Sequence, residues 1–141
     1  MAVLKDVLER ASLSLDGVLD AQVDIPIISG AQRQGDVIVI PRPNKKAATT
    51  KVPQSGVIVV RAETSSANTH SILPWDGDVY FDADKSGGGQ SGLVLGTLSV
   101  PEGSSAMLAH SEEHGANGIG AGTYEIRRQR EFQGEWMRVA D

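Results

Sequence analysis

The chain has 141 residues, no cysteine and a formal net charge of −5 at pH 7. This length predicts one domain spanning residues 1–141, and the missing cysteines exclude disulfides, thiolate zinc sites and cysteine nucleophiles. The net negative charge argues against direct, sequence-specific nucleic-acid binding, because phosphate backbones are bound by basic surfaces.

An amphipathic helix is predicted at residues 2–12, within a helical segment at 1–15. Apolar side chains recur there at helical spacing, at Val3, Leu4, Val7, Leu8 and Ala11. Such a short helix needs a packing partner, which is either this protein's own sheet or a neighbouring subunit. Asp6 and Glu9 fall where a secretory signal needs an apolar core, and no apolar run approaches the ~20 residues of a membrane span. We therefore expect a protein that is not secreted and does not bind membranes.

Beyond the helix, the pattern changes to short β segments separated by Gly, Pro, Asn and Asp. Many short strands at near-regular spacing, with few helical signals, are typical of barrels and two-sheet sandwiches. The sequence thus predicts an all-β fold, a small β-barrel or jelly-roll-like sandwich. The predicted strands are 21–28, 36–40, 57–62, 69–73, 78–82, 93–100, 105–110, 123–132 and 135–139.

Two extended loops are predicted between these strands. Residues 41–56 contain three prolines and four basic side chains, with almost no large apolar residue. Prolines interrupt ladder pairing and little in this segment rewards burial, so we expect a mobile basic Pro-rich loop or arm. Residues 83–92 are rich in glycine and are expected to form a second loop.

The histidines are the candidate metal ligands. His110, Glu112 and His114 alternate, so they would share one face if the strand continued through them, with His70 as a further ligand. Imidazole and carboxylate groups on a β scaffold hold the metal of cupin-type barrels. The alternative is that His110 and His114 cap a strand end and bond to loop backbone.

No catalytic residue or cofactor site is predicted. The GQSG segment at 89–92 lacks the strand–turn–helix context of a nucleophile elbow. The GIGAG segment at 118–122 is followed by a strand pattern, whereas a dinucleotide site needs a helix there. These glycines are therefore expected to form a tight turn into the next strand.

Basic residues gather in two segments, which makes the charge segregated along the chain. The candidate interaction residues are Arg42, Lys45, Lys46, Lys51, Arg127, Arg128 and Arg130. In the strand 123–132, Arg128 and Arg130 share a face with apolar residues. Either Arg128 pairs inside the domain with a carboxylate such as Glu112 or Glu113, or these arginines face a neighbouring subunit. Segregated charge suits self-association or docking on a charged partner, although an ordinary solvated surface is the simpler reading.

The motifs N-T-H at 68–70 and H-G…G-x-Y-x-I-R-R-Q-R-E…V-A-D at 114–141 carry a resemblance to known proteins. With them the chain resembles short uncharacterised proteins of bacteria and their phages, which share a GDV-type strand such as 35–37. That group has no assigned activity, so the resemblance implies no catalytic residue. It implies a phage or phage-related origin.

These observations predict a non-enzymatic structural or interaction protein. Its most concrete form is a phage virion accessory, such as a decoration or cement protein that binds a capsid shell as a homo-oligomer. The protein would then be found in the virion or in the cytoplasm of the bacterial host. Two alternatives stay open, a cupin-like metal-binding enzyme or sensor and a small partner protein in a bacterial defence operon.

Overall fold

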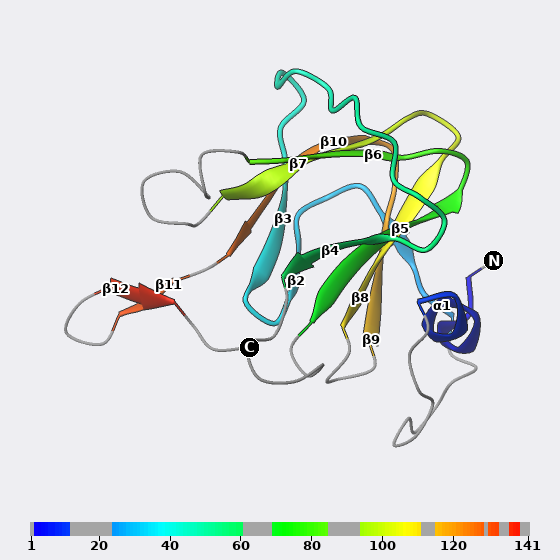
Figure 1. The fold of residues 1–141 in the computed structure, drawn as a ribbon, viewed down its shortest axis with the longest axis horizontal. Helices are drawn as coiled ribbons and strands as arrows, with labels where there is room; N and C mark the ends of the chain where they lie inside the picture. Colours follow the sequence, from blue (N-terminus) through cyan, green and yellow to red (C-terminus); the bar gives the residue numbers. More distant parts are fainter. Residues whose placement is uncertain are drawn as a thin grey trace.

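A computed structural model gives the structure of residues 2–11, 24–60, 69–84, 94–110 and 115–128, and the backbone of 130–132 and 136–138. Two five-stranded sheets form the body of the molecule and pack face to face (Figure 1). The first sheet contains, in order, β1 (Ile27–Ile28), β9 (Gly115–Ile119), β8 (Ser105–His110), β5 (His70–Asp76) and β4 (Val57–Val60). The second contains β2 (Gln32–Gln34), β3 (Val37–Pro41), β10 (Gly122–Arg128), β7 (Val94–Val100) and β6 (Tyr80–Ala83). A separate hairpin joins β11 (Arg130–Phe132) to β12 (Trp136–Arg138).

The fold is therefore the all-β sandwich that the strand spacing predicts. Over the described residues the two sheets stay separate, so the chain does not form the closed barrel that was the other expectation. The order of the strands shows that consecutive strands repeatedly change sheets, as between β5 and β6, β7 and β8, and β9 and β10. Residues far apart in the sequence consequently meet inside the sandwich.

The core between the sheets is mainly aliphatic, as expected from a chain with 4% aromatic residues. Along β10, Tyr124 and Ile126 point inward, whereas Thr123, Glu125 and Arg127 lie on the outer face, which is the alternation of a strand with one buried side. The core side chains that are fully buried are Val37, Val39, Ile72, Val79, Leu98, Ala106, Leu108, Ile119, Tyr124 and Ile126.

Tyr124 is a buried polar residue of this core, and its hydroxyl points at the β9–β10 turn. The hydroxyl lies 2.7 Å from the Gly120 carbonyl oxygen and 3.1 Å from that of Ala121, and burial raises its pKa. Tyr124→Phe removes this buried donor, so we expect the free energy of unfolding to fall by about 1 kcal/mol. Urea unfolding measures the change, with Tyr80→Phe at a half-buried ring as the control. An unchanged midpoint for Tyr124→Phe would show that the hydroxyl does not hold the turn.

The helix α1 (Leu4–Arg10) covers the outer face of the first sheet (Figure 1). Leu4, Val7 and Leu8 are buried in a second apolar cluster, which includes the outward side chains of β5 and β8. At its end, the Arg10 guanidinium lies 4.3 Å from the centre of the Trp75 ring and donates to the Pro74 carbonyl at 2.7 Å. The helix therefore packs on this chain's own sheet, the first of the two partners expected for it. All six residues of β8 are buried, because β8 lies between the core and the helix.

The crossing segment, residues 42–56, passes over the outer face of the second sheet on its way from β3 to β4. The Ala48 N–H donates to the Ser99 hydroxyl at 2.8 Å, and the Val52 N–H donates to the Val79 carbonyl at 2.9 Å. Ala48 and Val52 are buried, with 6% and 3% of their surface exposed. The expectation that this segment has little to bury is wrong. Its backbone forms hydrogen bonds beside β6, and this pairing places the side chains of Ala48 and Val52 in buried positions.

Two strands differ from the expected pattern. β2 falls in a polar stretch that predicts no strand, and β9 falls where glycines predict a turn. At Gly118 a Cβ atom would lie 2.5 Å from the Pro26 carbonyl oxygen, so the glycine permits the close approach of the chain that leads into β1. Of the predicted loop 83–92, residues 85–92 lie outside the described part of the chain. No helix among the described residues has the length and apolar character needed to cross a membrane.

Candidate functional site

Two histidines lie stacked in the interior, at one end of the sandwich. His70 begins β5 and His110 ends β8, and the register of these neighbouring strands places them opposite each other. Directly opposed residues point to the same face of a sheet, so both rings enter the space between the sheets. Their centroids are 4.1 Å apart and the ring planes differ by 9°. With 0% and 1% of their surface exposed, both imidazoles are out of reach of a substrate.

Gln34 of β2 links this histidine pair, which belongs to the first sheet, to the second sheet. Its amide nitrogen donates to the Leu108 carbonyl at 2.8 Å and to the Asn117 side-chain oxygen at 3.0 Å. These two acceptors fix the amide orientation, so the Gln34 oxygen faces His70 Nδ1 at 2.9 Å. Because an amide oxygen only accepts, Nδ1 of His70 carries the proton.

A buried ion pair also acts on the charge of His70. Gln34 and Val37 are paired across the hairpin of β2 and β3, which leaves Gly35 and Asp36 as a two-residue turn, and Gly35 has φ of 59°. This turn places the Asp36 carboxylate inside, where Arg128 Nε donates to it at 3.0 Å. Their side chains are 0% and 18% exposed, respectively. Arg128 therefore pairs within the domain, which was one of the two expectations for it. Its partner, however, is Asp36. Glu112 and Glu113, the carboxylates first considered, lie outside the described residues.

The surroundings keep His70 neutral. Burial is the main reason that the pKa of His70 is lowered from 6.5 to about 4, and the lowering by the neighbouring His110 and Arg128 exceeds the raising by Asp36. The neutral, buried imidazole of His70, stacked on the buried His110, suits a structural or proton-sensitive role better than acid–base catalysis. Of the predicted metal ligands, Glu112 and His114 lie outside the described residues. Within the described part of the chain, no three His, Cys, Asp or Glu side chains come together in a way that could hold a metal ion.

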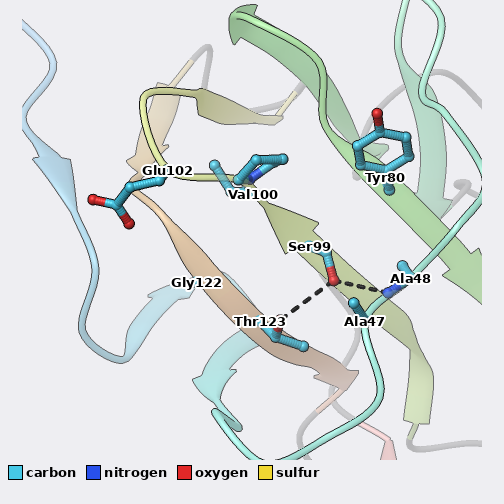
Figure 2. Close-up of a pocket in the computed structure, with 9 residues that line it drawn as sticks. Ala47, Ala48, Tyr80, Ser99, Val100, Glu102, Gly122 and Thr123 are labelled. Carbon is cyan, nitrogen blue, oxygen red and sulfur yellow. Dashed lines mark hydrogen bonds between the residues drawn. The ribbon is translucent and has the colours of Figure 1, made fainter.

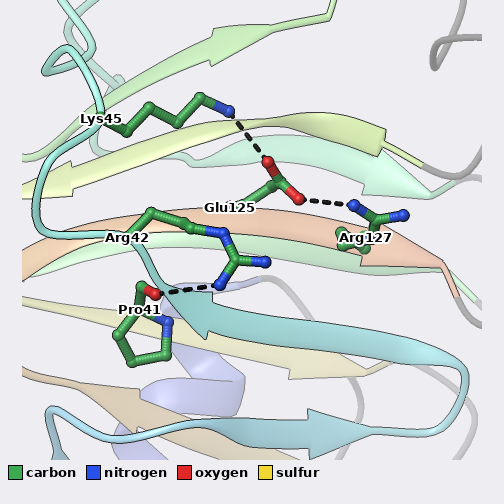
Figure 3. Close-up of polar contacts among 5 residues, drawn as sticks. All are labelled: Pro41, Arg42, Lys45, Glu125 and Arg127. Carbon is green, nitrogen blue, oxygen red and sulfur yellow. Dashed lines mark hydrogen bonds and ion pairs between the residues drawn. The ribbon is translucent and has the colours of Figure 1, made fainter.

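A different group of charges gathers on the outer face of the second sheet. Glu125 of β10 accepts from Arg127 at 2.7 Å and from Lys45 of the crossing segment at 3.2 Å. Figure 3 shows these two cations reaching the carboxylate from opposite sides, with Arg42 beside the same strand. Burial alone would raise the pKa of Glu125, but the hydrogen bonds from Arg127 and Lys45 outweigh it and lower the pKa.

Further cations extend this surface. Arg33 of β2 pairs with Ile38, which in turn pairs with Arg127, so Arg33 and Arg127 lie in one row on the outer face. Lys46 follows Lys45 and is exposed, as are Arg33 and Arg42. We call this surface the basic face; it consists of Arg33, Arg42, Lys45, Lys46 and Arg127 around Glu125. The face holds these five cations and two carboxylates, Glu125 and Asp82 of β6, which lies in the same row across Thr97, so it carries excess positive charge.

The structure thus separates the predicted interaction residues. Arg42, Lys45, Lys46 and Arg127 come together on the basic face, which Arg33 joins without having been predicted. Only the alternation of side chains along β2 could have indicated Arg33. Arg33 lies between two glutamines whose side chains point inward, so its own side chain points outward. Lys51 lies at the edge of β6, 3.5 Å from Asp78, and Arg128 is turned inward. The Arg130 side chain lies outside what the structure describes.

A surface hollow of about 420 Å³ opens beside the basic face, between the crossing segment and the end of the β7–β10 pair (Figure 2). Its lining includes Ala47, Ala48, Tyr80, Ser99, Val100 and Thr123. The Ser99 hydroxyl accepts the Ala48 N–H at 2.8 Å and lies 3.4 Å from the Thr123 hydroxyl; among the described residues, neither of these partners is a base that would activate it as a nucleophile. The residues that line the hollow form no motif in the sequence, so no pattern signals it.

Comparison with known proteins places the chain in a family. A family model described as Domain of unknown function (DUF8820) matches residues 33–129, more than half of the chain. The chain belongs to the DUF8820 family. The matched range contains the whole basic face, the hollow, and Gln34, Asp36, His70, His110 and Arg128. A search of curated proteins and a search of solved structures each found no match.

Proposed function

We propose that this protein is a non-enzymatic interaction module whose basic face docks on an acidic protein surface. The observation that carries the proposal is the excess of positive charge on one exposed sheet face of a chain with a net charge of −5. Local charge of one sign attracts a complementary patch and speeds its encounter, even where the net charge is opposite.

The arrangement of the basic face is better explained by binding than by stability. The Lys45 and Arg127 side chains are 34% and 32% exposed, and ion pairs of this exposure contribute little to folding. Glu125 instead holds both cations in place on a rigid sheet. Side chains that are already ordered lose less entropy on binding, so a preorganised face binds more tightly than a flexible arm.

The negative charge of the rest of the chain favours a protein partner over nucleic acid. A long polyanion would meet the repelling net charge of −5 as well as the basic face. An acidic patch on a protein would meet the basic face alone. The resemblance of the N-T-H and C-terminal motifs to short uncharacterised proteins of bacteria and their phages supports a virion as the setting. We therefore assign the role of a decoration or cement protein that binds a capsid shell as an oligomer.

Charge reversal on the basic face tests this function. The variant Arg33→Glu/Arg42→Glu replaces two exposed cations that do not pair with Glu125, so the fold should be retained. We expect it to sediment with shells lacking the protein at least about tenfold more weakly than the unaltered chain does, because attraction becomes repulsion. Binding should also weaken as salt rises from about 50 to about 500 mM, since exposed charges are screened.

The matched control is Lys5→Glu/Lys51→Glu, which makes the same change in net charge away from the basic face. This control should bind shells as the unaltered chain does. Size-exclusion chromatography with light scattering, with and without shells, gives the oligomeric state of each variant. A monomer that never binds shells, or equal weakening in both double variants, would overturn the proposed function.

A further inference from the structure

We infer that the hollow beside the basic face receives an apolar side chain from an extended acidic segment of the partner. This inference rests on the proposed function and names the kind of segment that the basic face recognises. The basic face would supply attraction and orientation, and the hollow would supply an anchor point. Such a division between an apolar anchor and a polar rim is common at protein interfaces.

The hollow has more than enough room for an aliphatic or small aromatic side chain, and its lining is mostly apolar. Its volume of about 420 Å³ lies at the lower end of the range of ligand pockets. Ala47, Ala48, Val100 and Pro101 are among the apolar residues of the lining, and the Tyr80 ring stands at one side (Figure 2). The Ser99 hydroxyl is held by the Ala48 N–H and lies within reach of the Thr123 hydroxyl. These two hydroxyls therefore have partners within the chain, and most of the lining surface is apolar, which favours an apolar occupant.

The hollow and the basic face are joined along two chain segments. Lys45 and Lys46 directly precede Ala47, and the Arg42 N–H donates to the Thr123 carbonyl at 2.8 Å. Thr123 and Glu125 are two residues apart on one strand, so they point to the same outer face about 7 Å from each other. A segment in extended conformation covers this distance in two to three residues, at about 3.3 Å per residue. A carboxylate at that spacing from the anchor would reach Lys45 or Arg42.

The charges around the hollow also set where the acidic residues must lie. Glu102 stands at the rim, on the side away from Ala47 (Figure 2). An acidic residue passing Glu102 would be repelled, whereas one passing Lys45 and Lys46 would be attracted. The recognised segment should therefore carry its acidic residues on one side of the anchor only.

Titration with synthetic peptides tests this inference. The first probe, of about ten residues, carries one leucine with two aspartates two and three positions away and serine elsewhere. A second probe has serine for leucine, and a third has lysine for aspartate. Each probe is made in two versions, one with the charged pair before the anchor position and one with it after. Both are needed because the hollow does not fix the direction in which the segment runs. Nuclear magnetic resonance of the full chain follows the amides of Ala47, Ala48, Ser99 and Thr123.

The leucine–aspartate probe should shift these amides and bind at least about tenfold more tightly than either other probe. Ala47→Trp fills the hollow without changing a charge. It should weaken binding of the leucine–aspartate probe as much as the change of leucine to serine in the probe does. Ala31→Trp, at an exposed alanine outside the lining, should leave the binding of the leucine–aspartate probe unchanged. Equal binding of the leucine and serine probes, or no effect of Ala47→Trp, would overturn the inference while leaving the basic face as the docking surface. Loss of shell binding by the control variant Lys5→Glu/Lys51→Glu would instead overturn the proposed function itself.

Discussion

Replacing Arg128 with methionine is expected to lower the free energy of unfolding by about 3 kcal/mol. The substitution keeps much of the apolar stem but removes the guanidinium that lies 3.0 Å from the buried Asp36 carboxylate. Breaking a buried pair from one side leaves the other charge in a poorly solvated place, and the cost exceeds the value of the pair itself. Arg128 is 18% exposed, so the loss should fall at the lower end of the range for such pairs. Guanidinium chloride unfolding measures it.

Arg127→Met provides the matched control, one position along the same strand. Arg127 is bonded to Glu125 on the outer face, so its loss should cost less than about 1 kcal/mol. Adding Asp36→Asn to Arg128→Met should recover part of the loss, because the neutral amide no longer needs a cation. Equal losses for Arg127→Met and Arg128→Met would show that the buried pair has no special role in the fold.

Acidification is the second change with a large expected effect. The pKa of His70 is lowered from 6.5 to about 4 in the folded chain, so the unfolded chain binds a proton between these values that the folded chain does not. The free energy of unfolding should therefore be highest above pH 6.5 and fall as the pH decreases toward about 4. This difference in pKa corresponds to roughly 3 kcal/mol. The groups that face the His70 ring are His110, Asp36 and Arg128, and burial is the main cause of the lowered pKa.

His70→Asn isolates this contribution. The asparagine amide nitrogen can donate to the Gln34 oxygen in place of Nδ1, but it does not titrate. The variant should be less stable at neutral pH, since the ring stack is lost, yet its stability should change less between pH 6.5 and 4 than that of the unaltered chain. Urea midpoints across this range, together with a resonance titration of the His70 ring, test the prediction. Parallel curves for the two proteins would contradict it.

Local patterns predict the elements whose residues follow one clear period. β8 spans residues 105–110 as expected, and α1 forms where apolar residues recur at helical spacing. β9 is an exception to this pattern. Its glycines allow two chain segments to lie close together, as where Gly118 lies against Pro26, and no local pattern in the sequence indicates this contact. β2 was missed because its polar side chains are bonded to the opposite sheet, as when Gln32 donates to the Gly118 carbonyl at 2.8 Å.

The candidate sites depend on pairings between distant parts of the chain. Arg128 suggests a buried carboxylate partner from its place in an apolar row, but Asp36 lies 92 residues away in the sequence. The basic face likewise arises from the register that sets Pro41 opposite Tyr124, which brings the start of the crossing segment over β10. Charge segregation in the sequence indicates that a positively charged surface exists, and the sheet topology decides which cations lie on it.

Hydrogen–deuterium exchange of the chain, free and bound to shells, tests the docking surface most directly. The basic face predicts slower exchange on binding in β2, around Arg33, and in residues 42–48 of the crossing segment. Exchange in α1, on the far side of the first sheet, should stay unchanged. Slower exchange confined to α1, or to the edge strands β1 and β4, would contradict the assignment of the basic face as the surface that docks.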